Sequence, residues 1–503
     1  MHQPFEQLIL TIYYLTLGIL AIYGAHRLVL LGLYYRTRGA HPPAPPPPSL
    51  WPRVTVQLPL YNEMYVAERL IRAVAALDYP ADRLEIQVLD DSTDETREIV
   101  AAEVARQRAR GVEVHHLRRG DRVGFKAGAL AAGLRQARGE LLAVFDADFV
   151  PRPDFLRRTV PWFADPAVGM VQACWEHLNR GFSLLTRIQA MFLDAHFLIE
   201  HAARNRAGRF FNFNGTAGIW RRRTIVEAGG WQHDTLTEDL DLSYRAQLAG
   251  WRFLFLPDVK VPAELPVEIN AFKRQQFRWA KGSVQTARKL LGRVFRSPVP
   301  LGVKAEAFFH LTSNGCYLLM VALSLLVFPA MEMRRGADPT LILAVDLPLF
   351  AFATLSFVAF YLGSQAARGG SWWRQLRRLP ALMGLGIGLA INNARAVLEG
   401  LRRDVGVFER TPKYSVEGAI ANWRGKRYRV DGDLSVLAEG LLALYFVAAF
   451  AVAVISDMWL SLPFLYLFVQ GFCYIVLLHL VSSLTVGRRA IAGRERGAHA
   501  DVS

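Results

Sequence analysis

Residues 54–100 read VTVQLPLYNEMYVAERLIRAVAALDYPADRLEIQVLDDSTDETREIV. A strand pattern over Val54–Leu58 is followed by an amphipathic helix pattern over Met64–Leu77. The same pair of patterns repeats directly, with a strand over Leu84–Leu89 and a helix over Glu95–Arg108. Strands that alternate with helices in this way predict a parallel sheet with helices on both faces.

The alternation continues with a strand over Val112–Leu117, a helix over Ala127–Arg135 and a strand over Leu141–Phe145. In an open sheet of this kind, ligands bind in the crevice outside the carboxyl ends of the strands. Asp90 and Asp91 directly follow one predicted strand, and Asp146 directly follows another. We therefore expect these carboxylates to meet at one ligand-binding edge of the sheet.

Long apolar segments flank this α/β region on both sides. The chain has 503 residues, 52% of them hydrophobic, and its mean hydropathy is +0.18. A helix needs about 20 predominantly apolar residues to cross a membrane. Five segments meet this requirement, namely Leu8–Leu33, Glu306–Met331, Thr340–Gly363, Ser435–Ile455 and Trp459–Leu484. The sequence therefore predicts an integral membrane protein.

The net charge of +15 is concentrated beside the apolar segments. Basic residues follow the first, third and last of them, at Arg36, Arg38, Arg374, Arg377, Arg378, Arg488, Arg489, Arg494 and Arg496. This positive-inside pattern places the α/β region in the cytosol, in our expectation at a bacterial inner (cytoplasmic) membrane. This orientation leaves Arg334 and Arg335 in an external loop, which is an exception to the positive-inside pattern. No nucleic-acid-binding motif accompanies the charge, so nucleic acid is not an expected partner.

Three further segments mix apolar residues with polar or basic ones. Phe182–Arg206 and Asn270–Arg296 combine bulky apolar and basic side chains, as helices on a membrane surface do, although packing on the sheet explains part of each equally well. Leu379–Leu398 is apolar but is interrupted near its end by Asn392 and Arg395, and we count it as interfacial.

These patterns predict eight consecutive parts of the chain. They are a transmembrane helix (1–38), a proline-rich linker (39–51), a cytosolic α/β domain (52–268), interfacial amphipathic helices (269–300), two transmembrane helices (301–364), a cytosolic or interfacial segment (365–434), two further transmembrane helices (435–487) and a basic cytosolic tail (488–503).

Two acidic motifs stand at predicted strand ends. Asp146-Ala147-Asp148 places two carboxylates one residue apart, and such hard oxygen ligands suit Mg²⁺ or Mn²⁺ carrying a diphosphate. Asp90 and Asp91 are adjacent carboxylates that repel, so at least one should accept hydrogen bonds or contact metal. They suit the N–H and hydroxyl groups of a nucleoside, and they also suit the start of the following helix.

A third acidic motif, Thr-Glu-Asp at residues 237–239, opens a predicted helix. Capping of that helix is one sufficient explanation, and a carboxylate that takes a proton from an acceptor hydroxyl is the other. Gln275, Arg278 and Trp279 share one helical face through their i, i+3, i+4 spacing. Arg278 could neutralise a departing diphosphate, and Trp279 offers a flat surface for a sugar ring. The alternative explanation of this motif is a basic helix at the membrane interface.

Together these motifs resemble the ordered signature of the family 2 membrane glycosyltransferases, of which the cellulose synthases are best known. Four motifs are more similar still to those of the cellulose synthase-like A group, the mannan and glucomannan synthases. They are QVLDDSTD at 87–94, FKAGAL at 125–130, FNGTAGIWR at 213–221 and QQFRW at 275–279. The resemblance is dense over residues 54–296 and implies an A-type, Rossmann-like mixed sheet domain joined to an α-helical transmembrane region.

The resemblance also implies a role for each motif. Donor binding would involve Asp90, Asp91, Lys126, Asp146, Asp148 and Glu63, with the metal on Asp146 and Asp148. The chemistry would involve Asp239, Glu238 and Arg278, and the acceptor would lie against Gln275, Trp279, Gly215, Thr216 and Trp175. Phe408, Thr411 and Lys413 are similar to the gating-loop pattern Phe-x-Val-Thr-x-Lys. Two positions differ from the family's sequence patterns. Arg410 replaces the valine of the gating-loop pattern, and Cys174 stands where the mannan-synthase pattern has arginine.

The implied reaction is an inverting transfer in which Asp239 deprotonates an acceptor hydroxyl, which then attacks the anomeric carbon. We expect UDP-glucose or GDP-mannose as donor, Mg²⁺ or Mn²⁺ as cofactor, and a growing β-glycan that is secreted through the transmembrane helices. A nonprocessive synthase that glycosylates a membrane lipid fits the interfacial helices equally well. An inactive sugar-nucleotide sensor or assembly subunit would require a lost catalytic residue, and every motif is present.

Overall fold

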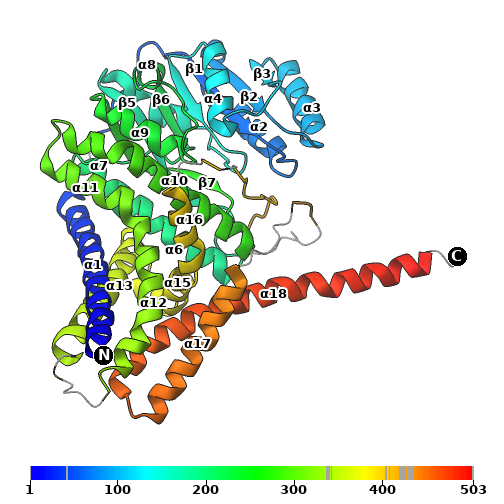
Figure 1. Ribbon diagram of the computed structural model, residues 1–503. Helices are drawn as coiled ribbons and strands as arrows, with labels where there is room; N and C mark the ends of the chain where they lie inside the picture. The colour runs from blue at the N-terminus through cyan, green and yellow to red at the C-terminus, as the bar shows by residue number, and fades with distance from the viewer. Residues whose placement is uncertain are drawn as a thin grey trace.

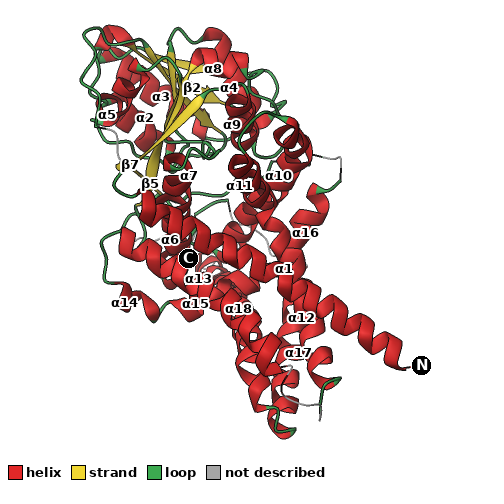
Figure 2. Ribbon diagram, turned by 90° about the vertical axis from the view of Figure 1, so that its left-hand side faces the viewer, coloured by secondary structure: helices red, strands yellow, loops and turns green. Residues whose placement is uncertain are grey.

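The computed structural model describes residues 2–40, 43–335, 340, 342–402, 405–406, 408–418, 426–428 and 435–500. Figure 1 and Figure 2 both show an α/β domain at one end of the molecule and a bundle of long helices at the other. A layer of helices lies between the two parts. The Phe408–Lys413 segment, which resembles a gating loop, lies within the described residues.

The α/β domain is built on a seven-stranded sheet of β1 (Val54–Leu60), β2 (Leu84–Asp90), β3 (Val114–Leu117), β4 (Leu141–Val144), β5 (Val168–His177), β6 (Gly218–Arg221) and β7 (Arg252–Ala263). The strand order is β3-β2-β1-β4-β6-β5-β7. β6 runs antiparallel to both of its neighbours, and the other pairs are parallel. The four predicted strands are confirmed as β1 to β4, and the sheet is mixed because β6 enters it in the opposite direction.

Helices cover both faces of this sheet. One face carries α2 (Ala67–Ala75), α3 (Thr96–Ala109), α5 (Phe155–Thr159) and the 3₁₀ segment η2 (Val160–Ala164), and the other carries α4 (Phe125–Gln136), α8 (Arg222–Glu227) and α9 (Glu238–Leu248). The short η1 (Ala81–Arg83) precedes β2. The three predicted helices of this region are present, and α4 begins two residues earlier than predicted, after Gly124 turns the chain with a left-handed φ of 73°.

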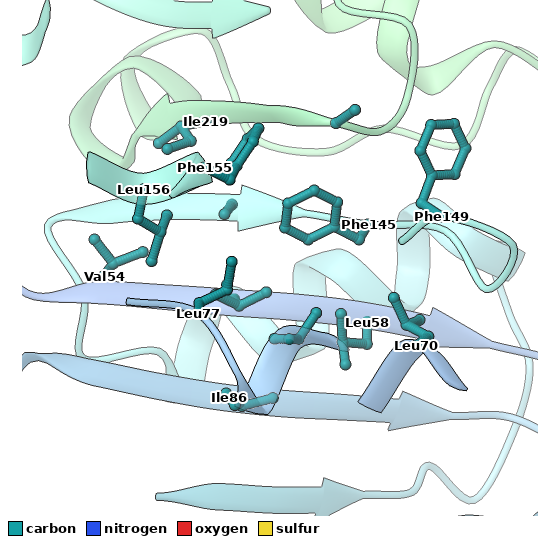
Figure 3. Packing of buried hydrophobic residues seen from close by; sticks show 14 of the residues in the cluster. Val54, Leu58, Leu70, Leu77, Ile86, Phe145, Phe149, Phe155, Leu156 and Ile219 are labelled. Atoms are coloured by element: carbon teal, nitrogen blue, oxygen red, sulfur yellow. The ribbon is translucent and has the colours of Figure 1, made fainter. Parts of the chain in front are cut away.

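Strand side chains alternate between two buried layers. Leu58 of β1, Ile86 of β2 and Phe145 after β4 pack with Leu70 of α2 in the layer that Figure 3 shows. Leu142 and Val144 of β4 belong to the other layer. Because both faces of the central strands are buried, a shift of one residue in register would misplace every side chain. The core therefore holds the strand ends, and the residues that follow them, in fixed positions.

Within the described part of the chain, the helical bundle contains five helices long and apolar enough to cross a membrane, or up to six if one bent pair counts as a span. The five segments are Pro4–Thr37, Leu301–Glu332, Leu343–Ala367, Ser435–Ile455 and Trp459–Val481. They correspond to α1 (His2–Thr37), α11 (Leu301–Thr312) with η4 (Ser313–Gly315) and α12 (Cys316–Glu332), η5 (Ile342–Asp346) with α13 (Leu347–Ala367), α17 (Ser435–Ile455), and η6 (Trp459–Ser461) with α18 (Leu462–Ala500). The structure thus has a helix at each predicted span.

The segment counted as interfacial is a broken helix. α15 (Leu379–Gly388) and α16 (Ala390–Gly400) meet at an angle of 42°, and the pair forms either a broken span or a re-entrant loop. The short α14 (Trp372–Leu376) precedes it. Leu382 and Leu385 of α15 are buried against α1, α6 and α13, so protein rather than solvent covers this part of the chain.

The layer between the sheet and the bundle consists of α6 (Leu184–Ala195), the π-helical η3 (His196–His201), α7 (Ala202–Arg206) and the long α10 (Ile269–Arg296). Ile188 of α6 and Phe272 of α10 pack in one cluster with Leu30 of α1 and Phe360 of α13. These helices are the two segments predicted as basic and amphipathic. The apolar side chains of α6 and α10 in this cluster are covered by helices of the bundle. Phe197 of η3 packs against Phe255 of β7, so packing on the sheet explains only part of the first segment.

A buried charged cluster fastens α10 to the last two apolar helices. Lys273 Nζ of α10 lies 2.6 Å from Glu439 Oε1 of α17 and donates to Ser435 Oγ at 2.8 Å. His479 Nε2 of α18 lies 3.3 Å from both Lys273 Nζ and Glu439 Oε2. Lys273 is 3% exposed and Glu439 0%. The position of α10 therefore depends on charges held by α17 and α18.

A second cluster joins the ends of α1, α12 and α13 that lie far from the sheet. Arg334 NH1 lies 2.7 Å from Asp346 Oδ2, and the same nitrogen donates to Tyr14 Oη at 2.8 Å. Tyr13 Oη donates to Asp346 Oδ1 at 2.7 Å. Arg335 pairs with Glu332 at 3.0 Å. Each arginine that the sequence places in the external loop therefore has a carboxylate partner.

Candidate active site

A cavity of about 180 Å³ lies outside the carboxyl ends of the parallel strands. Its wall includes Tyr61 after β1, Asp91 after β2, Asp146 after β4 and Glu264 after β7. This is the edge at which the sequence predicts the ligand. Most other predicted site residues line it too, namely Glu63, Lys126, Asp148, Trp175, Gly215, Glu238, Asp239, Gln275, Arg278, Trp279, Phe408, Thr411 and Lys413.

Two predicted site residues, Asp90 and Thr216, lie beneath the cavity rather than in its wall. Asp90 is 1% exposed, accepts a hydrogen bond from Ser92 N at 2.9 Å and lies 2.9 Å from His116 Nε2. The Thr216 hydroxyl accepts a hydrogen bond from the Asp146 backbone N–H at 2.9 Å. Asp90 therefore shapes the strand end and Thr216 positions Asp146, and the nucleotide and acceptor contacts expected of them stay predictions.

Aromatic and basic side chains form the end of the cavity beside Asp91. Arg119 Nε donates to Asp91 Oδ1 at 3.0 Å. The Arg122 guanidinium carbon lies 3.3 Å from the centre of the Tyr61 ring and 4.9 Å from that of Phe125. Sequence reasoning misses Tyr61 and Arg122, although Tyr61 directly follows β1 and the strand-end rule points to it. A flat ring and a guanidinium at this place suit a nucleobase and a phosphate.

Asp146 and Asp148 each pair with a lysine in the cavity. Lys126 Nζ lies 2.5 Å from Asp146 Oδ1 and donates to Gly215 O at 2.9 Å. Lys413 Nζ lies 2.7 Å from Asp148 Oδ2. Both carboxylates offer hard oxygen ligands at the cavity wall, and a diphosphate would add further oxygens. The donor set therefore fits a divalent cation that binds together with a diphosphate.

Asp239 and Glu238 begin α9 at the wall of the cavity. Burial and the adjacent Glu238 carboxylate raise the pKa of Asp239 to about 7. Burial also raises the pKa of Glu238, against the opposing charge of Lys126. The preceding Thr237 turns its hydroxyl to Thr286 of α10 at 3.3 Å and, among the described residues, makes no side-chain cap hydrogen bond. Helix capping by Thr237 therefore does not account for this motif.

Gly215 brings backbone close to Asp239. Its φ is +79°, and a Cβ at this position would lie 2.9 Å from Asp239 Oδ2 and 3.3 Å from Lys126 Nζ. Because a side chain would clash with the carboxylate and would also be strained at this φ, only glycine fits. The small-residue loop around Gly215 therefore leaves room beside the carboxylate whose pKa is near neutrality.

The second half of the wall comes from α10. Gln275, Arg278 and Trp279 all line the cavity, as their helical spacing predicts. Arg278 NH1 donates to Glu409 O at 2.6 Å, and its guanidinium carbon lies 4.6 Å from the centre of the Phe408 ring. Arg278 also lies close enough to Glu238, Asp146 and Asp239 for their charges to stabilise it. The helix thus places one guanidinium opposite the acidic groups of the sheet domain.

The Phe408–Lys413 loop completes the cavity. Phe408 and Phe125 stack with ring centres 6.0 Å apart, and Arg410 NH1 lies 3.0 Å from Glu63 Oε2. Burial raises the pKa of Glu63 to about 8, against the opposing charge of Arg410. Sequence reasoning names Arg410 only as a departure from a pattern, and it misses Glu264 and His177, which line the cavity from β7 and β5.

Comparison with known proteins shows which proteins this chain is similar to. The family described as "Glycosyltransferase like family 2" matches residues 52–282. Glucomannan 4-beta-mannosyltransferase 2 of Arabidopsis thaliana is 46% identical over 254 residues, which are 50% of this chain and 48% of that protein. Glucomannan 4-beta-mannosyltransferase 7 of the same plant is 38% identical over 368 residues, 71% of this chain and 63% of that protein. The chain thus spans less than two thirds of the length of these relatives.

Among solved structures, the mannosyltransferase PcManGT of Pyrobaculum calidifontis, in complex with GDP-Man and Mn²⁺, is similar with a TM-score of 0.51 and 24% identity. The match covers 70% of this chain and 98% of that one, and it shows a shared fold. The relatives, the family match and the motif residues gathered at one edge of a mixed sheet agree with one another. Residues 52–282 therefore form a domain of glycosyltransferase family 2.

Proposed function

We propose that this protein transfers a hexose from a nucleotide sugar to a growing β-glycan with inversion at the anomeric carbon. The observation that carries the proposal is the placement of Asp239, a half-buried carboxylate with a pKa of about 7, in one cavity with Arg278 and Lys126. A base of this kind is poised to take a proton near neutral pH. The guanidinium of Arg278 and the ammonium of Lys126 can stabilise the negative charge of a departing diphosphate.

The reaction then follows from the chain's own residues. Asp239 takes the proton of an acceptor hydroxyl, whose oxygen attacks the anomeric carbon while the bond to the diphosphate breaks on the opposite face. Arg278 and Lys126 stabilise the charge that develops on the leaving oxygen. Trp279 and Gln275 hold the acceptor in line. Mg²⁺ or Mn²⁺ on Asp146 and Asp148 would add positive charge beside the diphosphate.

GDP-mannose is the donor that we propose, with UDP-glucose as the alternative. The relatives at 46% and 38% identity are named as glucomannan mannosyltransferases, which favours a mannosyl donor. Mn²⁺ with GDP-mannose is also the pair named for the similar solved structure, so it is the first combination to test. The donor panel should include UDP-glucose, because the cavity residues suit either diphosphate.

The five apolar helices support a membrane location, and we propose that the catalytic domain faces the cytosol. The named relatives are plant proteins, so they give no support to the bacterial inner membrane that the sequence led us to expect. A polymer that leaves through the bundle is the first proposal, and a membrane lipid acceptor is the second. Product analysis separates them: long insoluble or oligomeric glycan supports the polymer, and one organic-extractable species supports the lipid.

Asp239→Asn provides the central test. With the purified chain, Mn²⁺ and GDP-mannose, the variant should lose transfer while its affinity for GDP stays within about twofold of wild type. Asp234→Asn is the matched control, since Asp234 lies in the preceding segment and pairs with Lys289 outside the cavity. If Asp239→Asn retains full transfer activity, the assignment of the base is wrong. If wild type transfers sugar from no donor of the panel, the proposed activity itself fails.

A further inference from the structure

Arg410 introduces a positive charge into the cavity where the gating-loop pattern that this chain resembles has valine. The residue belongs to the Phe408–Lys413 loop, in which Phe408, Thr411 and Lys413 follow that pattern. All four side chains line the cavity. Arg410 is therefore a cation of this chain that the family resemblance does not supply.

The guanidinium of Arg410 is largely removed from solvent. The side chain is 13% exposed, and its NH1 lies 3.0 Å from Glu63 Oε2, whose side chain is 11% exposed. The guanidinium carbon also lies 4.0 Å from the centre of the Tyr428 ring. Burying a charge is costly unless it is paired, and among the described residues Glu63 is the carboxylate that pairs with it. The ion pair with Glu63 thus keeps the Arg410 guanidinium at the cavity wall.

Arg410 stands in the donor half of the cavity. It lies close enough to Arg122, at the Asp91 end, for their charges to repel. Its partner Glu63 lies close enough to Asp148 for the two carboxylates to repel. A diphosphate that reaches from the Asp91 end to the Asp146-Ala147-Asp148 motif therefore passes Arg410.

Arg278 is another arginine of the cavity wall. Its charged neighbours in the cavity are Glu238, Asp146 and Asp239. Arg410 instead pairs with Glu63, which lies near Asp148, so the two arginines have different acidic neighbours. One comes from α10 and the other from the Phe408–Lys413 loop.

We propose that Arg410 binds the diphosphate of the donor and that Glu63 holds its guanidinium when no donor is present. This inference rests on the proposed function, because the diphosphate belongs to the nucleotide sugar. The planar fork of arginine matches two phosphate oxygens, and a doubly charged diphosphate is a stronger partner than one carboxylate. Donor binding would then exchange Glu63 for the diphosphate and draw the Phe408–Lys413 loop onto the donor.

The test compares nucleotides that differ by one phosphate. The affinities of the detergent-purified chain for GDP and for GMP are measured by calorimetry with Mn²⁺ present, and UDP and UMP form a second pair. Arg410→Val should weaken GDP binding about tenfold or more and GMP binding less than about threefold, because a charge-assisted contact to the β-phosphate is lost. Arg410→Lys should recover part of the loss. Arg427→Val is the matched control, since Arg427 pairs with Glu95 outside the cavity.

Each outcome has one meaning. Selective loss of GDP affinity in Arg410→Val, with an unchanged melting temperature, supports the proposal. Equal losses of GDP and GMP affinity would mean that Arg410 only holds the Phe408–Lys413 loop in place, and they would overturn the proposal. In that case Glu63→Gln should lower the two affinities equally as well. Unchanged affinity for both also overturns it. If wild type binds neither GDP nor UDP, the proposed function fails before the question of Arg410 arises.

Discussion

Lys413 Nζ lies 2.7 Å from Asp148 Oδ2, so a lysine of the Phe408–Lys413 loop holds the carboxylate that we assign to a divalent cation. The same ammonium donates to Glu264 O at 2.8 Å, which fixes its position. An ammonium and a metal ion cannot both lie against one oxygen without strong repulsion. Cation binding at Asp148 therefore requires Lys413 to move.

The first prediction concerns this competition. Lys413→Met should tighten Mn²⁺ binding in the absence of nucleotide by about tenfold or more, because it removes a buried ammonium that pairs with the Asp148 carboxylate. Titration followed by electron paramagnetic resonance of free Mn²⁺ measures the change. Lys426→Met is the control, because Lys426 donates to the Tyr414 carbonyl away from the cavity wall. Weaker Mn²⁺ binding in Lys413→Met would mean that the lysine helps to hold the metal.

The second prediction is a pH profile. Burial and Glu238 raise the pKa of Asp239 to about 7, so acidification below that value protonates the proposed base. The turnover number should fall by roughly tenfold per pH unit below the pKa and level off above it. Initial rates with saturating donor and acceptor between pH 5 and 9 give the profile. A rate that stays constant down to pH 5.5 would remove Asp239 from the role of base.

The third prediction separates the acceptor from the donor. Trp279 lines the cavity from α10, on the same helical face as Gln275 and Arg278. Trp279→Ala should raise the KM for the acceptor roughly tenfold or more, since an aromatic surface against a sugar is lost, and it should leave the affinity for GDP nearly unchanged. Steady-state kinetics with an oligosaccharide primer measures the first quantity, and calorimetry measures the second. Equal effects on both would place Trp279 in the donor site.

The fourth prediction concerns the buried cluster that fastens α10. Lys273→Met leaves Glu439 charged and buried, which should cost about 3–5 kcal/mol of stability. The double variant Lys273→Met with Glu439→Leu should recover most of the loss, because no unpaired charge remains. Thermal unfolding of the purified chain gives the comparison. Lys304→Met is the control, since the Lys304 ammonium donates to the Phe295 carbonyl in an exposed hydrogen bond. A single variant as stable as wild type would show that water reaches Glu439.

Much of the fold follows from the sequence because its signals are local. The strand and helix patterns from Val54 to Phe145 depend on side-chain periodicity, and the structure has the corresponding elements. The apolar helices depend on composition over about 20 residues, which is equally local. Antiparallel β6 is different, because its four residues are too few for a pattern and its direction is set by its neighbours β4 and β5.

The candidate site divides in the same way. Asp146 lies at an expected strand end and Asp239 at an expected helix start, so their meeting in one cavity follows from the order of the elements. Arg278 lies within α10, and its helical spacing from Gln275 and Trp279 predicts only that the three share a face. Asp90 and Asp91 could not be separated, because only the packing of His116 and Arg119 decides which carboxylate is buried and which faces the cavity. Arg410 and Glu63 are 347 positions apart in numbering, and no pattern in the sequence links them.

The pairing of Arg334 with Asp346 has an electrical consequence. A voltage across a membrane does work on net charge, about 2.3 kcal/mol per elementary charge per 100 mV. Arg334 and Asp346 are 2.7 Å apart, and Arg335 and Glu332 are 3.0 Å apart, so each pair sums to zero. At the far ends of α1, α12 and α13, each arginine therefore belongs to a pair with no net charge. A membrane potential would then do little work on either pair.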